Sequence, residues 1–425
     1  MTDLFEDLAR RGLIHQETDA EGLRKHCAAG PRLVYCGFDP TASSLTIGNL
    51  VAILLLRRFQ DRGHRPVVVM GGGTGLIGDP SGKETERTLR TREEIDANVA
   101  GQRPIFERLL SFSGPNAARI ANNADWLEKL SFVEALRDVG KHFSVNMMIH
   151  KDSVRRRLEE REQGISYTEF SYMLLQAYDF QHLHDSMGVT IQVAGSDQWG
   201  NIVAGIDLTR RTRQVELFGL TAPLVTKADG GKFGKTESGA IWLTADRTSP
   251  YAFYQFWLNT LDADVPRFLK TFTLLPLPEI DRLVAEHERD PGPRVAHRAL
   301  AAHVTELVHG ASAREHAEAA ARALFSGDVA HLPEATLSEV FANAPSTEHA
   351  RATLAGEGLS LVDLLVEAGV AKSKRESREF LSSGAVSING ERAGVDGRLT
   401  AGNLLHGTIA LIRRGKKTWH VTRWR

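Results

Sequence analysis

Cysteine is scarce in this sequence: only Cys27 and Cys36 occur among 425 residues. Two thiols are too few for a disulfide framework, and their scarcity favours the reducing environment of the cytoplasm. Long apolar runs are also absent, because a run such as residues 50–56 is far too short to cross a bilayer, so no membrane partner is expected. The first twelve residues, MTDLFEDLARRG, are acidic and amphipathic, which is not the pattern of a signal peptide.

Familiar metal and nucleotide motifs are missing as well. Neither His-Glu-x-x-His nor Cys-x-x-Cys occurs, so no protein-bound structural metal is expected. Residues 73–78 fit Gly-x-Gly-x-x-Gly but continue into a polar loop instead of a helix, which argues against a nicotinamide or flavin dinucleotide. Residues 234–236, Gly-Lys-Thr, match the last three residues of the P-loop motif Gly-x-x-x-x-Gly-Lys-Thr. The first glycine of that motif is replaced by Asp229, which argues against a P-loop.

The formal net charge is only −1, but the charge is unevenly distributed. Residues 358–425 contain 12 Lys and Arg against 6 Asp and Glu, whereas the rest of the chain contains 40 against 47. A basic segment attached to an acidic body suits a protein that holds a polyanion at one end.

The first half of the chain has the pattern of an α/β fold. Three apolar segments, residues 33–36, 67–70 and 190–193, are each followed by a Gly-containing turn and separated by helical stretches. This alternation predicts a mostly parallel sheet with right-handed crossovers. Residues 104–185 are expected to be mainly helical and to form an insertion packed beside the sheet.

We therefore expect four parts: an α/β domain at 1–220 with the helical insertion, a lysine-containing loop and helical domain at 221–326, a linker at 327–357 and a small α+β module at 358–425. The linker is predicted because residues 327–357 mix Pro, Ala, Ser, Thr and Gly without periodicity. In the last part, residues 359–368 and 372–382 are expected to be helices. Asn389 and Gly390 predict a hairpin turn, and a second hairpin is expected from 408 to 423.

Three turns at predicted strand ends carry the polar residues of a ligand site: residues 37–41, 71–79 and 195–201. In an open parallel sheet, ligands bind outside the carboxyl ends of the strands. Each turn offers glycines for close backbone approach and a carboxylate for hydroxyl or ammonium groups. A fourth segment, residues 232–236 with two lysines, lies in the polar stretch 226–239, which we expect to be a loop that closes on phosphates.

Six stretches in this order carry a family resemblance over essentially the whole chain: YCGFDPTASSLTIGNL, GTGLIGDPSGK, VGKHFSVNMM, YTEFSYMLLQAYDF, GSDQWGN and PLVTKADGGKFGKTESG. The sequence resembles the bacterial tyrosyl-tRNA synthetases of class I. The resemblance implies a Rossmann-type catalytic domain, a helical domain and a small RNA-binding module of a ribosomal-protein type. It further implies a cytoplasmic homodimer that uses L-tyrosine, ATP with magnesium, and tRNA(Tyr) in two steps, through tyrosyl-adenylate.

The resemblance also implies roles for individual residues. Tyrosine binding falls to Tyr35, Tyr172, Gln176, Asp179 and Gln198. ATP binding falls to Gly37, Asp39, Gly48, Gly195, Asp197 and Lys235. Phosphate and catalytic contacts fall to Thr41, Thr46, Asn49, Lys83, Arg87, Lys232, Lys235 and Thr236. The basic residues expected to contact tRNA are Lys374, Arg375, Arg378, Arg413, Arg414, Lys416 and Lys417. Independently, Tyr172, Gln176 and Asp179 have the spacing of one helix face.

One motif departs from the family. Where class I enzymes have His-Ile-Gly-His, this chain has Thr46-Ile47-Gly48-Asn49. Threonine retains a hydroxyl donor and asparagine retains amide donors, while Gly48 still allows a nucleotide close to the helix start. We therefore expect a working site in which other donors carry more of the phosphate binding.

Two alternatives remain open from the sequence. One is a catalytically inactive relative that only binds RNA, which the retained lysine segment argues against. The other is the sibling enzyme for tryptophan, but Tyr35 with Asp179 favours a phenol over an indole. Pyrophosphate exchange with competing amino acids would separate all three.

Overall fold

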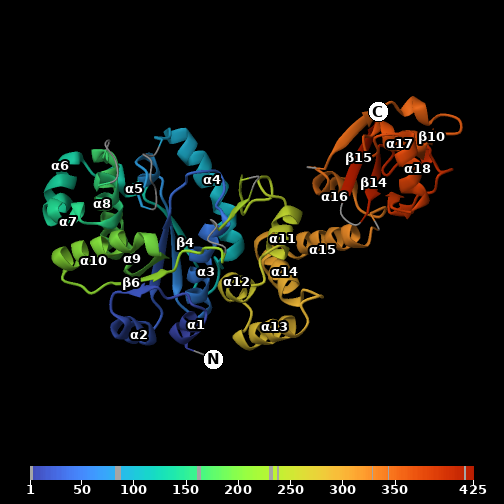
Figure 1. Ribbon diagram of the computed structural model, residues 1–425. Coiled ribbons are helices and arrows are strands. Elements are labelled where there is room, and N and C mark those ends of the chain that lie inside the picture. Colours follow the sequence, from blue (N-terminus) through green and yellow to red (C-terminus); the bar gives the residue numbers. More distant parts are fainter. Residues whose placement is uncertain are drawn as a thin grey trace. The chain divides into compact units, whose positions relative to one another are not determined.

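The computed structural model describes residues 3–81, 88–159, 164–228, 233–236, 239–327, 329–342, 344–415 and 418–425. The chain forms two compact units. Unit 1 comprises Met1–Thr248 and Trp257–Val308, and unit 2 comprises Ser249–Phe256 and His309–Arg425. Each unit is described by itself (Figure 1).

Unit 1 is built on a six-stranded sheet of order β1-β6-β5-β2-β3-β4. Five strands are parallel and the short edge strand β1 is antiparallel to β6. The strands are β1 (Gln16–Glu17), β2 (Leu33–Phe38), β3 (Arg65–Met70), β4 (Arg119–Asn122), β5 (Val189–Gly195) and β6 (Phe218–Ala222). This confirms the predicted α/β fold with a Rossmann-type parallel sheet.

Helices cover both faces of this sheet, which explains why β3 and β6 are buried almost throughout. Helices α3 and α4 lie on one side, and α9 and α10 lie on the other (Figure 1). The helices of unit 1 before residue 248 are α1 (Leu4–Arg10), α2 (Ala20–Ala28), α3 (Ile47–Asp61), α4 (Arg92–Leu109), α5 (Ala124–Leu127), α6 (Phe132–Glu134), α7 (Val145–Ile149), α8 (Asp152–Glu159), α9 (Tyr167–Met187) and α10 (Trp199–Arg213).

The helical insertion differs from the prediction in one respect. Residues 104–185 were expected to be mainly helical, but they include β4, which pairs with β3 and extends the sheet. Strand β4 is only four residues long, so its pattern is too short to be recognised from alternation. The polar residues Asn122 and Asn123 at its end consequently lie at the carboxyl edge of the sheet.

A group of helices follows the sheet in unit 1. They are α12 (Val265–Phe272), α13 (Leu277–Arg289) and α14 (Val295–His309). Amphipathic sequences bury one side of each helix, as with Phe268, Leu269 and Phe272 in α12. The helical character predicted for this region is confirmed, although the division into compact units falls at residue 308 instead of 326.

Unit 2 contains a five-stranded sheet of order β12-β11-β14-β15-β9, in which only β9 and β15 run parallel. Its elements are α15 (Ala311–Ser326), α16 (Glu334–Val340), β9 (Ser346–His349), β10 (Leu359–Ser360), α17 (Leu361–Glu367), α18 (Lys374–Ser382), β11 (Val386–Ile388), β12 (Glu391–Arg392), β13 (Arg398–Leu399), β14 (Ile409–Arg414) and β15 (Thr418–Trp424). Both predicted helices and both predicted hairpins are present. Asn389 and Gly390 have positive φ, as a tight two-residue turn requires.

The predicted linker at 327–357 is wrong. This stretch includes α16 and β9, and β9 is a full member of the sheet through its pairing with β15. Leu337 and Phe341 are buried in one apolar cluster with Leu411 and Val421. The segment lacks periodicity because its elements are short, yet distant strands bury its few apolar side chains.

No helix among the described residues combines the length and the apolar composition that a membrane crossing requires.

Candidate active site

A pocket of about 650 Å³ in unit 1 lies at the carboxyl ends of strands β2, β3 and β5. Thirteen residues predicted from the sequence line this pocket: Tyr35, Gly37, Asp39, Thr41, Thr46, Gly48, Asn49, Tyr172, Gln176, Asp179, Gly195, Asp197 and Gln198. The volume suits an amino acid together with a nucleotide. Every predicted tyrosine-binding residue is among them.

Some predicted residues lie outside the described part of the chain. These are Lys83, Arg87, Lys232, Lys416 and Lys417. Lys235 and Thr236 form the short strand β7 (Lys235–Thr236), for which only the backbone is described.

Tyr35 and Asp179 are two buried polar residues that line the pocket. Both side chains are almost fully buried, and the hydroxyl of Tyr35 has no hydrogen-bond partner among the described residues. Asp179 accepts hydrogen bonds from Asn123 Nδ2 at 2.9 Å and from Trp126 Nε1 at 2.7 Å, one on each carboxyl oxygen. A buried hydroxyl without a partner beside a buried carboxyl is suited to a ligand that brings its own hydroxyl group.

Burial determines the protonation of this pair. It raises the pKa of Asp179 to about 7, and the hydrogen bonds from Asn123 and Trp126 limit the rise. Burial, together with the charge of Asp179, raises the pKa of Tyr35 well above 10. Near pH 7, Tyr35 is therefore neutral and Asp179 is close to its midpoint of ionisation.

Asp39, at the turn after β2, connects two elements. Its Oδ1 accepts a hydrogen bond from Thr74 Oγ1 at 2.7 Å, and its Oδ2 accepts one from Tyr172 Oη at 2.9 Å. Thr74 belongs to the turn after β3, and Tyr172 belongs to α9. Asp39 therefore holds the ends of two neighbouring strands and α9 in a fixed arrangement around the pocket.

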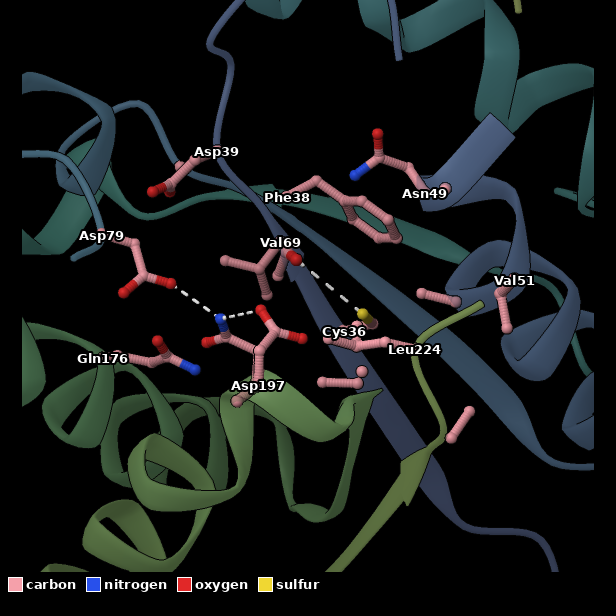
Figure 2. Close-up of a pocket in the computed structure, with 18 of the residues that line it drawn as sticks. Cys36, Phe38, Asp39, Asn49, Val51, Val69, Asp79, Gln176, Asp197 and Leu224 are labelled. Atoms are coloured by element: carbon pink, nitrogen blue, oxygen red, sulfur yellow. Dashed lines mark hydrogen bonds between the residues drawn. The ribbon is translucent and has the colours of Figure 1, made fainter. Parts of the chain in front are cut away.

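A second carboxylate cluster lies across the pocket. The amide nitrogen of Gln198 donates to Asp79 Oδ2 at 2.7 Å and to Asp197 Oδ2 at 3.0 Å, and Figure 2 shows these two bonds as dashed lines. Asn201 holds the other end of this amide by donating to Gln198 Oε1 at 3.0 Å. Burial raises the pKa of Asp79, because its carboxylate is removed from water. These carboxylates give this wall of the pocket an affinity for ammonium and hydroxyl groups.

Glycines keep the pocket open at two positions. A methyl group added at Gly37 would meet nothing within 4 Å, and one added at Gly48 would meet only the Thr46 hydroxyl at 3.5 Å. Both therefore border free space that a side chain would partly fill. Gly195 is different, because an added carbon would lie 2.6 Å from Asp197 Oδ1 and would displace that carboxylate.

Thr46 and Asn49 bond to each other at the start of α3. Asn49 Oδ1 accepts from the backbone N–H and from the hydroxyl of Thr46, both at 3.0 Å. The amide oxygen is thus used within the helix start, and the amide NH2 group of Asn49 remains available toward the pocket that the residue lines. Hydrogen-bond donors at a helix N-terminus suit phosphate.

Residues 241 and 242, which follow the lysine segment, contact this same helix start. The backbone N–H of Ile47 donates to Ile241 O, and a short bridge joins Thr46 to Trp242. Gly234 has a φ of 77°, and a carbon added there would lie 3.0 Å from Ile47. The backbone at Gly234 therefore lies against the predicted phosphate end of the pocket.

Four residues around the pocket were not predicted from the sequence. Thr74, Asp79 and Asn123 line it, and Trp126 bonds Asp179 from behind. Asp79 belonged to a turn that the sequence had already singled out. Asn123 and Trp126 follow β4, so recognising that strand would have placed them at the edge of the sheet.

The predicted tRNA-contacting residues lie in unit 2. Lys374, Arg375 and Arg378 are exposed on α18, and Lys374 pairs with Asp363 at 2.7 Å. Arg413 and Arg414 end β14 at the hairpin turn, as expected. Arg414 donates to the carbonyl of Val370 at 3.1 Å and lies over the Phe380 ring of α18, so helix and hairpin adjoin.

Comparison with known proteins gives full-length matches. A family model described as tRNA synthetases class I (W and Y) matches residues 28–326, and one described as Tyrosine--tRNA ligase SYY-like C-terminal domain matches residues 336–422. The chain is 53% identical over 425 residues to the tyrosine–tRNA ligase of Geobacillus kaustophilus, covering 99% of this chain and 100% of that one. It is 49% identical to the tyrosine–tRNA ligase of Staphylococcus carnosus, covering 100% of this chain and 99% of that one. A C-terminally truncated mitochondrial tyrosyl-tRNA synthetase of Aspergillus nidulans has a similar structure, with a TM-score of 0.70 and 32% identity, covering 76% of this chain and 95% of that one.

Proposed function

Because the chain belongs to the tyrosine–tRNA ligases of class I, we propose that the pocket of unit 1 joins L-tyrosine to ATP and then passes the tyrosyl group to tRNA(Tyr). The first step forms tyrosyl-adenylate and releases pyrophosphate. The second step transfers the tyrosyl group to the terminal adenosine of the tRNA and releases AMP. The tryptophan alternative finds no support, since the full-length relatives are tyrosine enzymes.

The buried pair Tyr35 and Asp179 is the observation that carries this proposal. The unpartnered hydroxyl of Tyr35 and the carboxyl of Asp179 both line the pocket, so a phenol placed between them gains two hydrogen bonds. The ionised Asp179 accepts the phenol proton, while Asn123 and Trp126 hold the carboxyl in position. A ring without a hydroxyl leaves these groups unsatisfied, which is the physical basis for rejecting phenylalanine.

The amino-acid end of the substrate is proposed to bind Asp79, Tyr172 and Gln176. Gln176 Oε1 is buried and has no partner within the described ranges, and the carboxylate of Asp79 supplies the negative charge that an ammonium group needs. The resemblance implies that Gln198 contacts the reacting carboxylate of tyrosine. The amide nitrogen of Gln198 donates a hydrogen bond to Asp79, so it lies beside the proposed binding position of the ammonium group. The substrate would thereby be fixed at both ends.

ATP is proposed to occupy the rest of the pocket. Asp197 and Gly195 suit the ribose hydroxyls, with Asp39 nearby, and the open space beside Gly37 and Gly48 suits the nucleotide itself. The phosphates would lie at the start of α3, where the Asn49 amide and the hydroxyls of Thr41 and Thr46 border the pocket. Magnesium enters as part of the substrate, as MgATP.

The first chemical step needs positioning and charge stabilisation more than proton transfer. An oxygen of the tyrosine carboxylate, already ionised near pH 7, forms a bond to the α-phosphorus while the bond to the pyrophosphate oxygen breaks. Negative charge grows on the leaving pyrophosphate. We propose, from the family resemblance, that Lys83, Arg87, Lys232, Lys235 and Thr236 stabilise it. The backbone of Gly234, next to Lys235 in the chain, lies beside Ile47 at the start of α3, which agrees with this role.

The second step uses the same pocket and a basic surface of unit 2. A ribose hydroxyl of the terminal adenosine forms the new ester bond to the tyrosyl carbonyl carbon, and the bond to the AMP phosphate oxygen breaks. The module at 358–425 is proposed to bind tRNA through Lys374, Arg375, Arg378, Arg413 and Arg414, with Lys416 and Lys417 in the hairpin turn. Arg375 and Arg378 are exposed one turn apart, which suits consecutive phosphates.

A homodimer is proposed from a group of exposed apolar side chains. Phe132, Val133 and Leu136 lie at α6 and the turn after it, and Val145 and Met147 belong to α7. Helices α6, α7 and α8 lie together at one edge of unit 1 (Figure 1). Clustered exposed apolar side chains mark protein interfaces, and a second copy is the partner that the resemblance implies.

We also propose that the enzyme works in the cytoplasm. Cys27 and Cys36 are both buried and unpaired, which agrees with a reducing environment. Cys36 lines the pocket, so its thiol must stay reduced for the site to keep its shape.

Tyrosine-dependent exchange of radioactive pyrophosphate into ATP tests the first step, with each of the twenty amino acids in turn. Exchange that requires tyrosine, together with charging of tRNA(Tyr), supports the proposal. Absence of exchange from a folded protein that still binds tRNA would establish the inactive RNA-binding relative instead.

A further inference from the structure

Three side chains outside the pocket converge in the helical part of unit 1. They are Asp262, in the loop before α12; His287, in the last turn of α13; and His297, in the first turn of α14. The three ligand atoms lie within 4.8 Å of one another. Among the described residues, these three side chains are close enough together to bind one metal ion, and they are His and Asp residues, which are common metal ligands.

The distances agree with a small divalent cation. Both histidines direct Nε2 toward the same oxygen, Asp262 Oδ1, which lies 3.5 Å from His287 and 3.0 Å from His297. Neighbouring ligand atoms of a tetrahedral Zn²⁺ are about 3.3 Å apart, given bonds of about 2.0–2.1 Å. The carbonyl oxygen of Thr260, 3.1 Å from His297 Nε2, is a fourth polar atom beside the two nitrogens and the carboxylate oxygen.

The access to these residues also suits a metal. The His297 ring is fully buried, so the protein holds it in place beside Asp262. Asp262 is 73% exposed, so an ion can reach its carboxylate directly from solvent.

We propose that Asp262, His287 and His297 bind one divalent transition-metal ion of the Zn²⁺ class, with water completing the coordination. Two imidazoles and a carboxylate form a ligand set that zinc prefers over magnesium. The ion would fasten the loop before α12 to the facing ends of α13 and α14. Its role is therefore stabilisation of this helical part, separate from the ATP site.

The surroundings of the three side chains predict a modest affinity for the metal ion. The Nδ1 atoms of His287 and His297 are buried, and no described residue forms a hydrogen bond with either of them. Metal-binding histidines normally donate from this atom, and losing such a partner weakens binding about 10–100-fold. Arg294 adds a positive charge near His297. We expect binding in roughly the micromolar range, well below the strength of structural zinc fingers.

Isothermal titration of the full-length, metal-free protein with ZnCl₂ tests the site, without ATP or magnesium. We expect one Zn²⁺ per chain and a melting temperature that rises with Zn²⁺ concentration. Co²⁺ in place of Zn²⁺ should give visible absorption bands from the bound ion. Asp262→Ala should weaken the binding at least tenfold, and because Asp262 is exposed and far from the pocket in sequence, its tyrosine-dependent exchange without zinc should equal that of the parent protein.

A matched control is His303→Ala, which removes an exposed histidine from the same helix, α14. It should leave the stoichiometry, the affinity and the Co²⁺ bands unchanged. Zinc binding that is equal in Asp262→Ala and the parent protein overturns the proposal, as does a parent protein that binds no zinc. Loss of binding in His303→Ala would place the ion elsewhere. None of these outcomes bears on tyrosine activation.

Discussion

The carboxyl of Asp179 combines two properties that the pocket needs. Asn123 and Trp126 each donate to one of its oxygens, and this fixes its orientation. Burial makes ionisation of this carboxyl unfavourable, and a hydrogen bond from a phenol hydroxyl would stabilise the ionised form. Tyr35, whose hydroxyl has no partner in the part of the chain that the structure describes, completes the proposed recognition of the phenol.

Tyr35→Phe removes one hydrogen bond to the substrate and leaves the shape of the pocket intact. The kcat/KM for tyrosine in pyrophosphate exchange should fall roughly tenfold, which corresponds to a hydrogen bond of about 1.4 kcal/mol. Activity with phenylalanine should be unchanged or higher. Tyr178→Phe, half-buried on the same helix as Asp179 but outside the pocket, is the control. Equal losses in both variants would contradict a specific role for Tyr35.

The raised pKa of Asp179 predicts a pH dependence. Below about pH 7 the free enzyme carries a protonated Asp179, which cannot accept the phenol proton as a carboxylate does. The kcat/KM for tyrosine should therefore fall by up to about tenfold per pH unit below 7. The Asp179→Asn variant should have a low kcat/KM for tyrosine, and its pH profile should lack the inflection near pH 7. If the pH profile of the parent protein has no inflection near pH 7, Asp179 ionises at a lower pH and the prediction is wrong.

The same shift has a defined sign for stability. Between about pH 4 and pH 7 the unfolded chain has released this proton while the folded chain retains it, so the contribution of Asp179 to stability decreases as pH rises through this window. Asp179→Asn should remove this part of the pH dependence in urea unfolding.

Helix α3 begins with a bonded pair, Thr46 and Asn49, where related enzymes have two histidines. Thr46→Val keeps the shape but removes the hydroxyl that Asn49 Oδ1 accepts, so the Asn49 amide loses one of its two anchors. Pyrophosphate exchange should slow roughly ten- to a hundredfold, equivalent to about 1–3 kcal/mol, with tyrosine affinity nearly unchanged.

Two further substitutions at this position sharpen the comparison. Thr46→Ser keeps the hydroxyl and should retain near-parental exchange. Thr46→His should be tolerated, since Gly48 leaves open space beside it. If Thr46→Val exchanges at the parental rate, the hydroxyl is not used and the phosphate contacts fall to Thr41, Asn49 and the lysines.

Helix α18 presents Arg375 and Arg378 to solvent, and their joint replacement by alanine is preferable to a truncation. Deleting residues from 358 onward would remove Leu411 and Val421 from the cluster that buries Leu337 and Phe341. The double variant should charge tRNA poorly, and the slope of log affinity against log salt should flatten by roughly one unit per arginine. Tyrosine-dependent exchange should not change.

Arg322→Ala removes an exposed arginine of unit 2 from α15 and serves as the control. If Arg322→Ala and the double variant lose the same tRNA affinity, tRNA is bound by general electrostatic attraction and not by a specific surface of α18.

For the molecule as a whole, the exposed apolar group around α6 predicts the state of assembly. Val133 is 71% exposed in a single chain, so Val133→Asp should not unfold it but should place a charge in the proposed interface. Sedimentation should give a dimer for the parent protein and a monomer for the variant. Leu261→Asp, at a site 48% exposed and outside this group, should remain a dimer. A parental monomer would contradict the assignment of this surface.

Contiguous stretches of the chain were sufficient to predict most of the fold. Strands β2, β3 and β5 have dense apolar sequences followed by Gly-containing turns, and Asn389-Gly390 encodes its turn locally. The short elements could not be predicted in the same way. Strand β4 and the segment with α16 and β9 are stabilised by partners distant in sequence, and periodicity carries no information about such partners.

The sequence by itself determined which chemical groups surround the pocket: Tyr35 and Asp179 for a phenol, a helix start for phosphates, and a basic end for a polyanion. Tertiary structure decided their properties. Asp179 ionises near neutrality only because distant segments exclude water and supply Asn123 and Trp126, and Asp262 meets His287 and His297 only because three separate elements end at one place. The physical reason is that side-chain identity is local, whereas burial and mutual distance depend on contacts between residues far apart in the chain.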